Sequence, residues 1–332
     1  MTLDRIFSSH MVLPAGRPLV FFGKGAGCGR IKIAGNEAAF SSDGEEWRAE
    51  LPSMEYGGPY TVSVELDGEA IELSDVYIGE VYLFAGQSNM QFRLDQTNTP
   101  KERRRADGRL RIFCTDRTEL SDFKTPDDGW TVCDADNVEL WSAIAYLVSS
   151  EISARKNVAV GAIACYEGAT AIESWVPVGT YERMGISIPK TERHPDHLSP
   201  AFEYRNRDGM MYNTSLAEAI PYPLTAVVWY QGESDTYGEE AKLYAKELTE
   251  LIRIWREDFL SPELPFVVVQ IADCEIRLCD AWREVQSAQL EVAKTVPFVK
   301  TVVSRDICET DDIHPMTKDK LSERITAALL EF

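Results

Sequence analysis

The spacing of hydrophobic residues changes near residue 75, and this change divides the chain into two regions. Before it, short segments alternate apolar and polar positions, as half-buried antiparallel strands do. We expect strands at 19–22, 30–34, 47–51, 60–66 and 70–73. Asp67-Gly68, between the last two, is a strong hairpin signal. The pattern therefore predicts a small N-terminal β-sandwich domain over residues 1–76.

The second region, residues 77–332, has continuous apolar runs separated by helical patterns. Runs without alternation are typical of strands that are covered on both faces. We expect these strands at 81–85, 110–114, 158–165, 225–230, 265–272 and 298–303, and helices at 141–154, 209–220, 239–257, 281–295 and 315–330. This order predicts an α/β fold, a doubly wound α/β/α domain with a mainly parallel sheet.

Polar clusters follow three of the predicted strands: 86–89, 168–170 and 231–235. A single cluster of this kind is more often turn chemistry than catalysis. However, the carboxyl ends of parallel strands meet at one edge of a sheet, where α/β enzymes bind their ligands. Three clusters at such ends therefore predict an active site at this edge.

Ser88, in the first cluster, is a candidate nucleophile because an apolar strand stops abruptly at its hydroxyl. A serine hydroxyl attacks an ester only when a base accepts its proton. His314 lies near the predicted junction of the last strand and helix, and Asp311 and Asp312 precede it closely enough to orient its ring. A serine, a histidine and an acid together indicate acyl transfer.

Charge and composition exclude several other classes of protein. The chain has 332 residues, 54 acidic against 34 basic, and a net charge of −20, which disfavours nucleic acids and anionic membranes as partners. No apolar run is long enough to span a membrane, and the N-terminus does not resemble a secretory signal, so we expect a cytoplasmic protein.

Metal sites and cofactors are not expected. The seven cysteines are scattered as reduced residues would be, and Cys274 and Cys279 have no second pair to complete a zinc site. His194 and His197 flank Asp196 in a pattern that could ligate a metal, but no third ligand cluster accompanies them. The polar stretch 177–207 around them is interpreted as a loop that covers the substrate.

Several motifs resemble those of the sialate O-acetylesterase-like carbohydrate esterases of the SGNH/GDSL hydrolase superfamily. They are Gly86-Gln-Ser-Asn-Met90, Trp229-Tyr-Gln-Gly-Glu-Ser-Asp235 and Asp312-Ile-His-Pro315, with further likeness at 7–13, 57–60, 168–175 and 211–213. The likeness extends over nearly the whole chain and keeps the order of the motifs. It implies a serine esterase that needs no cofactor.

The resemblance also assigns roles to individual residues. Ser88 would be the nucleophile and His314 the base, and the superfamily's usual spacing favours Asp311 over Asp312 as the orienting acid. The backbone N–H groups of Ser88 and Gly168 would form the oxyanion hole. A side chain from the third cluster would complete it, with Gln231 preferred and Ser234 as the alternative. Glu233 and Asn89 are interpreted as groups that support this site, not as proton carriers.

At two positions the residue differs from the one that is usual in the family. Ala169 stands where a second glycine is usual, and Asp235 where asparagine is frequent. Both departures concern the oxyanion pocket and leave the nucleophile unaffected.

The sequence thus predicts a carbohydrate O-acetylesterase that acts on an acetylated sugar or oligosaccharide through Ser88, His314 and Asp311. An esterase for acetylxylan or another acetylated oligosaccharide is one alternative. A non-catalytic carbohydrate-binding protein is the alternative from another class. No oligomeric state is predicted.

Overall fold

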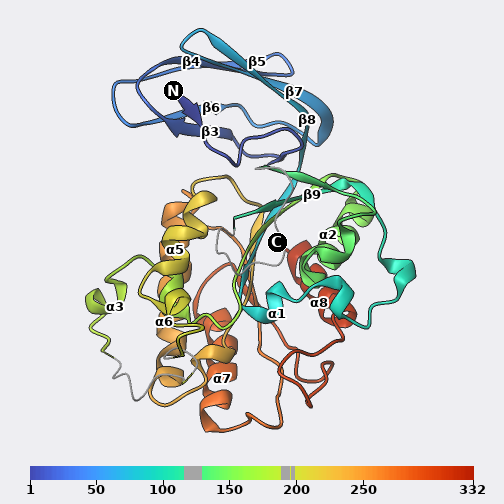
Figure 1. Cartoon of the computed structure of the whole chain (residues 1–332), viewed down its shortest axis with the longest axis vertical. Helices are drawn as coiled ribbons and strands as arrows, with labels where there is room; N and C mark the ends of the chain where they lie inside the picture. The colour runs from blue at the N-terminus through green and yellow to red at the C-terminus, as the bar shows by residue number, and fades with distance from the viewer. Residues whose placement is uncertain (116–128, 188–194, 196–198) are drawn as a thin grey trace.

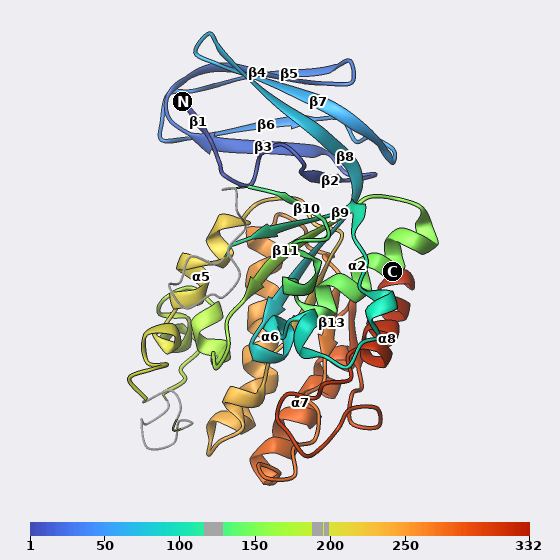
Figure 2. The ribbon, with the colours of Figure 1, turned by 45° about the vertical axis from the view of Figure 1, so that its right-hand side comes forward.

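The computed structural model describes residues 1–115, 129–187, 195 and 199–332 (Figure 1). Its N-terminal strands lie at one end of the molecule, and the α/β region forms the rest (Figure 2). The strands of the first region are β1 (Thr2–Leu3), β2 (Val12–Pro14), β3 (Leu19–Lys24), β4 (Gly27–Ile33), β5 (Asn36–Ser42), β6 (Glu46–Leu51), β7 (Gly57–Leu66) and the start of β8 (Glu69–Gly86).

Most of these strands pair in two antiparallel groups, whereas β2 pairs in parallel with β8. One contains β1, β3 and β6, and the other contains β4, β5, β7 and the first part of β8. The hairpin predicted at Asp67-Gly68 is confirmed, because Leu66 pairs with Glu69 and the two turn residues have φ of 52° and 85°. The sequence pattern missed β5, whose residues carry few large apolar side chains.

Strand β8 crosses the predicted domain boundary at 76/77 without a break. Contacts also join the two regions: the Trp130 indole N–H donates to the carbonyl of Ile6 at 2.7 Å, and the Tyr222 hydroxyl donates to that of Val12 at 2.8 Å. The β-sandwich and the division into two domains stay predictions.

The second part of β8 lies inside a large, mostly parallel sheet, which confirms the predicted α/β class. The strand order is β10-β9-β11-β8-β12-β13-β14, and every pairing is parallel except that of β10 with β9. The added strands are β9 (Asp107–Cys114), β10 (Thr131–Cys133), β11 (Val160–Tyr166), β12 (Ala226–Tyr230), β13 (Phe266–Val269) and β14 (Val299–Val302). The six predicted strands are present as β8, β9, β11, β12, β13 and β14, whereas β10 was not predicted.

Helices cover both faces of this sheet (Figure 1). On one side α2 (Ala143–Lys156) packs against α8 (Asp319–Leu330), and on the other α6 (Glu240–Asp258) packs against α7 (Asp280–Thr295). Tyr244, Leu248 and Trp255 recur on the buried face of α6, as an amphipathic helix requires. Within the described ranges, no helix has the length and apolar character that crossing a membrane requires.

The remaining helices whose bounds lie within the described residues are short. They are α1 (Ser88–Gln91), α3 (Thr180–Arg183) and α5 (Met210–Thr214), with 3-10 turns at Leu94–Gln96, Lys101–Arg103, Val138–Leu140, Ile172–Trp175, Tyr204–Asn206, Leu216–Glu218 and Glu233–Asp235. The helix expected at 209–220 is thus only the short α5 followed by a 3-10 turn. The helix expected from 315 begins at Asp319, because residues 315–318 are not helical.

Candidate active site

The parallel register brings the three polar clusters to one level of the sheet. Gly86, the last residue of β8, pairs with Tyr166 at the end of β11 and with Tyr230 at the end of β12. Gly86 has a φ of 141°, and a Cβ there would lie 2.1 Å from the carbonyl oxygen of Tyr230. Only glycine allows β8 to approach β12 this closely before the chain turns into α1.

Ser88 and His314 meet at this edge although 226 residues separate them. The Ser88 Oγ lies 2.8 Å from the His314 Nε2, within hydrogen-bond distance. Phe92, which follows α1, stacks on the imidazole with the ring planes 15° apart and the centroids 5.7 Å apart. The ring is therefore held by packing on one side and by the nucleophile at Nε2.

The two candidate acids differ in their relation to the imidazole. Asp312 Oδ1 accepts the backbone N–H of His314 at 2.8 Å and lies 3.9 Å from its Nδ1. Within the described part of the chain, the Asp311 carboxylate makes no hydrogen bond or ion pair and is exposed. The 3.9 Å separation is too long for a direct hydrogen bond but short enough for attraction to a protonated ring. The geometry therefore favours Asp312 over Asp311.

Replacing each acid by its amide separates the two candidates. Asp312→Asn should lower kcat for ester hydrolysis by about 10-fold, a modest loss because its side chain is 68% exposed. Asp311→Asn should change kcat by less than about 2-fold. Steady-state kinetics with p-nitrophenyl acetate measure both effects, and a larger loss in the Asp311 variant would reverse the preference.

The imidazole is held mainly in its neutral form. Burial lowers the pKa of His314 from its ordinary value of 6.5, the charges of Lys318 and Arg277 lower it further, and Asp312 acts in the opposite direction. A neutral ring with a free Nε2 lone pair is the form that can accept the proton of Ser88.

Ester hydrolysis should therefore rise with pH through a midpoint below about 6.5. The sign follows because the active form is the deprotonated one and its pKa is lowered. A profile of kcat/KM for p-nitrophenyl acetate between about pH 4 and 8 measures this midpoint. A midpoint above 6.5, or no pH dependence, would contradict a neutral imidazole base.

Two predicted oxyanion donors lie beside the nucleophile. Ser88 is the first residue of α1, and its amide N–H has no acceptor within the described residues. Gly168 follows β11, and a Cβ placed on it would lie 3.4 Å from the Cβ of Ser88. Its N–H donates to Gln91 Oε1 at 2.9 Å, so Gln91 contacts the site although the sequence analysis did not select it.

Gln231 has a different position from the one expected for an oxyanion donor. Its side chain is fully buried, and both amide hydrogens are used, one by the carbonyl of Thr170 at 2.9 Å and the other by the carboxylate of Asp235. Its Oε1 accepts from the hydroxyl of Tyr244 at 2.8 Å. Gln231 therefore links the second and third clusters, and its side chain has no free N–H group to offer an oxyanion.

The side chain of Ser234, the alternative donor, stays a prediction. The backbone amide of Ser234 donates to Gln87 Oε1 at 3.2 Å, and the same oxygen accepts from the amide of Gly232 at 3.2 Å. Gln87, directly before the nucleophile, thereby ties the loop after β8 to the loop after β12.

Two residues of the 3-10 turn Tyr204–Asn206 hold the loop that carries Gly168. Arg205 Nη1 donates to the carbonyl of Gly168 at 2.9 Å, and Asn206 Nδ2 donates to that of Ala169 at 2.7 Å. Ala169 has a φ of 56°, a conformation that glycine adopts more easily, which explains why glycine is usual there. No local pattern marks Arg205 or Asn206 as parts of the site.

Asn89 and Glu233 support the site, as interpreted from the sequence. Asn89 Nδ2 donates to Glu233 Oε1 at 2.6 Å and to the carbonyl of Ile313 at 2.9 Å. Burial raises the pKa of Glu233, whose carboxylate has no contact with Ser88 or His314 among the interactions of the described residues. The metal pattern weighed at His194 and His197 lies outside those residues.

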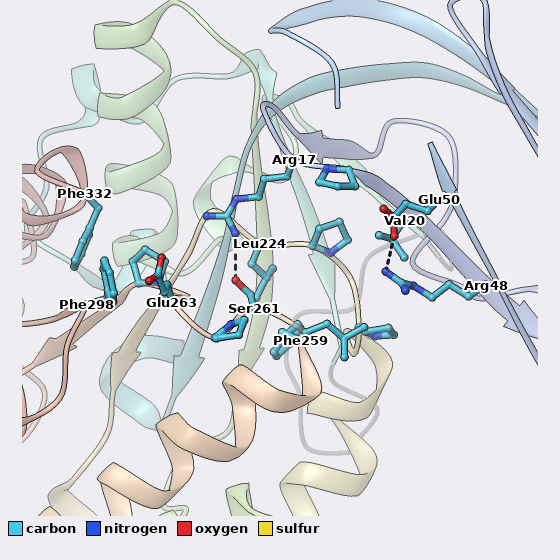
Figure 3. A pocket seen from close by; sticks show the side chains of 16 residues that line it. Arg17, Val20, Arg48, Glu50, Leu224, Phe259, Ser261, Glu263, Phe298 and Phe332 are labelled. Carbon is cyan, nitrogen blue, oxygen red and sulfur yellow. Dashed lines mark hydrogen bonds and ion pairs between the residues drawn. The ribbon is translucent and has the colours of Figure 1, made fainter. Parts of the chain in front are cut away.

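A separate cavity of about 780 Å³ lies at the opposite edge of the sheet (Figure 3). Leu224, Pro265 and Phe298, which line it, precede the strands β12, β13 and β14. Arg17, from the N-terminal region, reaches across it to the hydroxyl of Ser261 at 3.5 Å. This cavity is therefore at the amino ends of the strands and is not part of the candidate active site.

Comparison with known proteins identifies the family. The family described as "Carbohydrate esterase, sialic acid-specific acetylesterase" matches residues 78–331. The chain belongs to this family. The match confirms the resemblance that the motifs around Ser88, Gln231 and His314 indicated, and it extends over the whole α/β region.

Individual relatives agree with this membership. The chain is 25% identical to the sialate O-acetylesterases of Pongo abelii and Homo sapiens, over 90% of this chain and 62% of each relative. It thus spans less than two thirds of the length of these curated relatives. A carbohydrate acetylesterase from Xanthomonas citri has a similar structure, with a TM-score of 0.85, 25% identity and coverage of 98% of this chain and 74% of that one.

Proposed function

We propose that this chain is a carbohydrate O-acetylesterase that removes acetyl groups from sugars through a covalent acetyl-enzyme. The observation that carries the proposal is the 2.8 Å contact between Ser88 Oγ and His314 Nε2 at the carboxyl ends of parallel strands. Membership of the sialic acid-specific acetylesterase family supports the same reaction.

The first half of the reaction forms the acetyl-enzyme. His314 Nε2 takes the Ser88 hydroxyl proton as Ser88 Oγ bonds to the acetyl carbonyl carbon. The oxyanion that develops is stabilised by the amide N–H groups of Ser88 and, once released from Gln91, of Gly168. The bond between the carbon and the sugar oxygen then breaks, and the imidazolium returns its proton to that oxygen.

The second half releases acetate. A water molecule attacks the acetyl-Ser88 ester while His314 accepts its proton, and collapse of the second tetrahedral intermediate returns the proton to Ser88 Oγ. We assign Asp312, in preference to Asp311, to the stabilisation of the imidazolium. Gln231 is assigned to the support of the loops and not to the oxyanion hole.

An acetylated sialic acid is the substrate that the family name favours, and acetylated xylo-oligosaccharides are the alternative. Release of acetate from a panel that contains both distinguishes them. The Ser88→Ala variant serves as the control for uncatalysed hydrolysis. Release from sialic acid esters alone would support the sialate assignment, and release from xylo-oligosaccharides alone would move the enzyme to the second group.

Three further parts of the proposal rest on the sequence pattern. Residues 1–76 form a β-sandwich domain and residues 77–332 the catalytic domain. The protein acts in the cytoplasm on acetylated sugars. Nucleic acids and membranes are not its partners, in keeping with its net charge of −20.

A further inference from the structure

Lys318 is a buried cation next to the catalytic pair. It directly precedes α8, its side chain is 0% exposed, and its Nζ donates to Asn89 Oδ1 at 2.8 Å. The ammonium also lies over the rings of Phe92 and Tyr230, 5.3 Å and 5.6 Å from their centroids. A lysine buried to this extent is rare unless hydrogen bonds and nearby charges compensate the loss of water.

The hydrogen bonds of Lys318 fix the orientation of the Asn89 amide. An ammonium group can only donate hydrogen bonds and the Glu233 carboxylate can only accept them, so Oδ1 must face Lys318 and Nδ2 must face Glu233. In this orientation Nδ2 also reaches the carbonyl of Ile313 at 2.9 Å.

This arrangement joins the two catalytic residues through their chain neighbours. Asn89 directly follows Ser88, and Ile313 directly precedes His314. The Asn89 amide therefore connects the turn that carries the nucleophile to the loop that carries the base. If the amide rotated, its oxygen would face the Ile313 carbonyl and the connection would be lost.

We infer that Lys318 is a positioning residue that fixes the Ser88–His314 pair through Asn89. This role rests on the proposed function. It is electrostatic as well as geometric, because a positive charge near His314 opposes a second one on the ring.

The charges around both groups agree with this role. Burial lowers the pKa of Lys318 to about 8, so it is mainly protonated at neutral pH, and the negative groups around it oppose this shift. Among the described residues, the titratable groups whose charges act on Lys318 are Cys308, Glu233 and Glu309, and the ring of Tyr230 lies under its ammonium. Those whose charges act on His314 are Lys318, Asp312 and Arg277.

The Lys318→Met variant tests the inference, with the His314 imidazole followed by NMR titration and its signals assigned through a His314→Gln variant. The pKa of His314 should rise by roughly half a unit or more, and kcat for p-nitrophenyl acetate should fall more than KM changes. Lys320→Met, at an exposed position in α8, should leave both unchanged. An unchanged pKa and kcat in a folded Lys318→Met protein would overturn the inference.

A second variant keeps the test valid if Lys318→Met does not fold. Glu233→Gln retains the acceptor for Asn89 but removes the charge that raises the pKa of Lys318. A neutral amine can also accept hydrogen bonds, so the Asn89 amide is no longer fixed once Lys318 loses its proton. The decline of kcat at alkaline pH should therefore begin at lower pH in Glu233→Gln than in the wild type, and identical alkaline limbs would contradict the role.

The NMR titration needs no turnover, so it separates this inference from the proposed function. If Ser88→Ala kept full esterase activity while Lys318→Met still shifted the pKa of His314, the esterase proposal would fail, and with it the catalytic meaning of the shift. If Ser88→Ala were inactive and the pKa of His314 did not move, the esterase proposal would stand and Lys318 would have only a structural role.

Discussion

Ser88→Ala should lower kcat/KM for p-nitrophenyl acetate by at least about 10⁴-fold, because no other group in the site replaces the nucleophile. The melting temperature should change little. Ser88 is only half-buried, and its side chain loses one hydrogen bond, to His314, worth about 1 kcal/mol. Parallel measurements of kinetics and thermal unfolding separate loss of chemistry from loss of fold.

Ser174→Ala is a matched control for this variant. The Ser174 hydroxyl donates to the carbonyl of Ala171 at 2.9 Å in the loop after β11, and it has no contact with His314 among the interactions of the described residues. The activity of Ser174→Ala should remain within a few-fold of that of the wild type. A wild-type protein that binds acetylated sugars without any turnover would instead support the alternative of a carbohydrate-binding protein.

His314→Ala should reduce kcat by about 10³-fold or more, since Ser88 then has no base within reach. The removed ring leaves space beside Phe92, and added imidazole should restore part of the activity in a concentration-dependent way. Kinetics with and without imidazole measure both effects. The double variant with Ser88→Ala should be no slower than Ser88→Ala alone, because the two residues act as one unit.

His10→Ala provides the comparison for the histidine variant. His10 Nδ1 lies 2.8 Å from Asp75 Oδ2 in the N-terminal region. Asp75 belongs to the first part of β8, whereas Ser88 follows the carboxyl end of that strand. The His10→Ala variant should retain wild-type activity, and imidazole should have no effect on it. A His314→Ala protein with normal turnover would exclude His314 as the base.

The sequence predicted the large features of the fold because they follow from local pattern. Unbroken apolar runs placed six of the seven strands in the order β10-β9-β11-β8-β12-β13-β14, and only the short β10 was missed. Asp67-Gly68 placed the hairpin between β7 and β8 in the N-terminal region. The pairing of Ser88 with His314 was also predictable, since parallel strands must place their carboxyl ends at one edge. Both residues could be found without knowledge of distant contacts.

Hydrogen-bond partners inside the site were not predictable in the same way. The donors of Gln231 are used by Thr170 and Asp235, and its oxygen by Tyr244, and only the folded chain brings these groups together. Asp311 and Asp312 are neighbours that both carry a carboxylate. The choice between them depends on how the chain turns before His314, which brings Asp312 to the backbone N–H of that residue. Spacing alone favoured Asp311, whereas the geometry favours Asp312.

Lys318 illustrates the same limit for burial. In the sequence it stands in a polar stretch at the start of the helix expected over 315–330, where a lysine is normally solvated. Its burial results from the approach of Asn89 and Phe92, at α1, and of Tyr230, at the end of β12, two segments that are distant from it in the sequence. A charged side chain that is buried by contacts between distant segments leaves no periodic pattern of hydrophobic residues in the sequence.

Trapping the acyl-enzyme tests the central claim most directly. The wild type is mixed with p-nitrophenyl acetate, quenched in acid during the first turnovers and digested for mass spectrometry. The proposal predicts one acetyl group on Ser88, and none on that residue in the His314→Ala variant. Rapid turnover with an acetyl group on another residue, or with no covalent adduct, would contradict Ser88 and His314 as the catalytic pair.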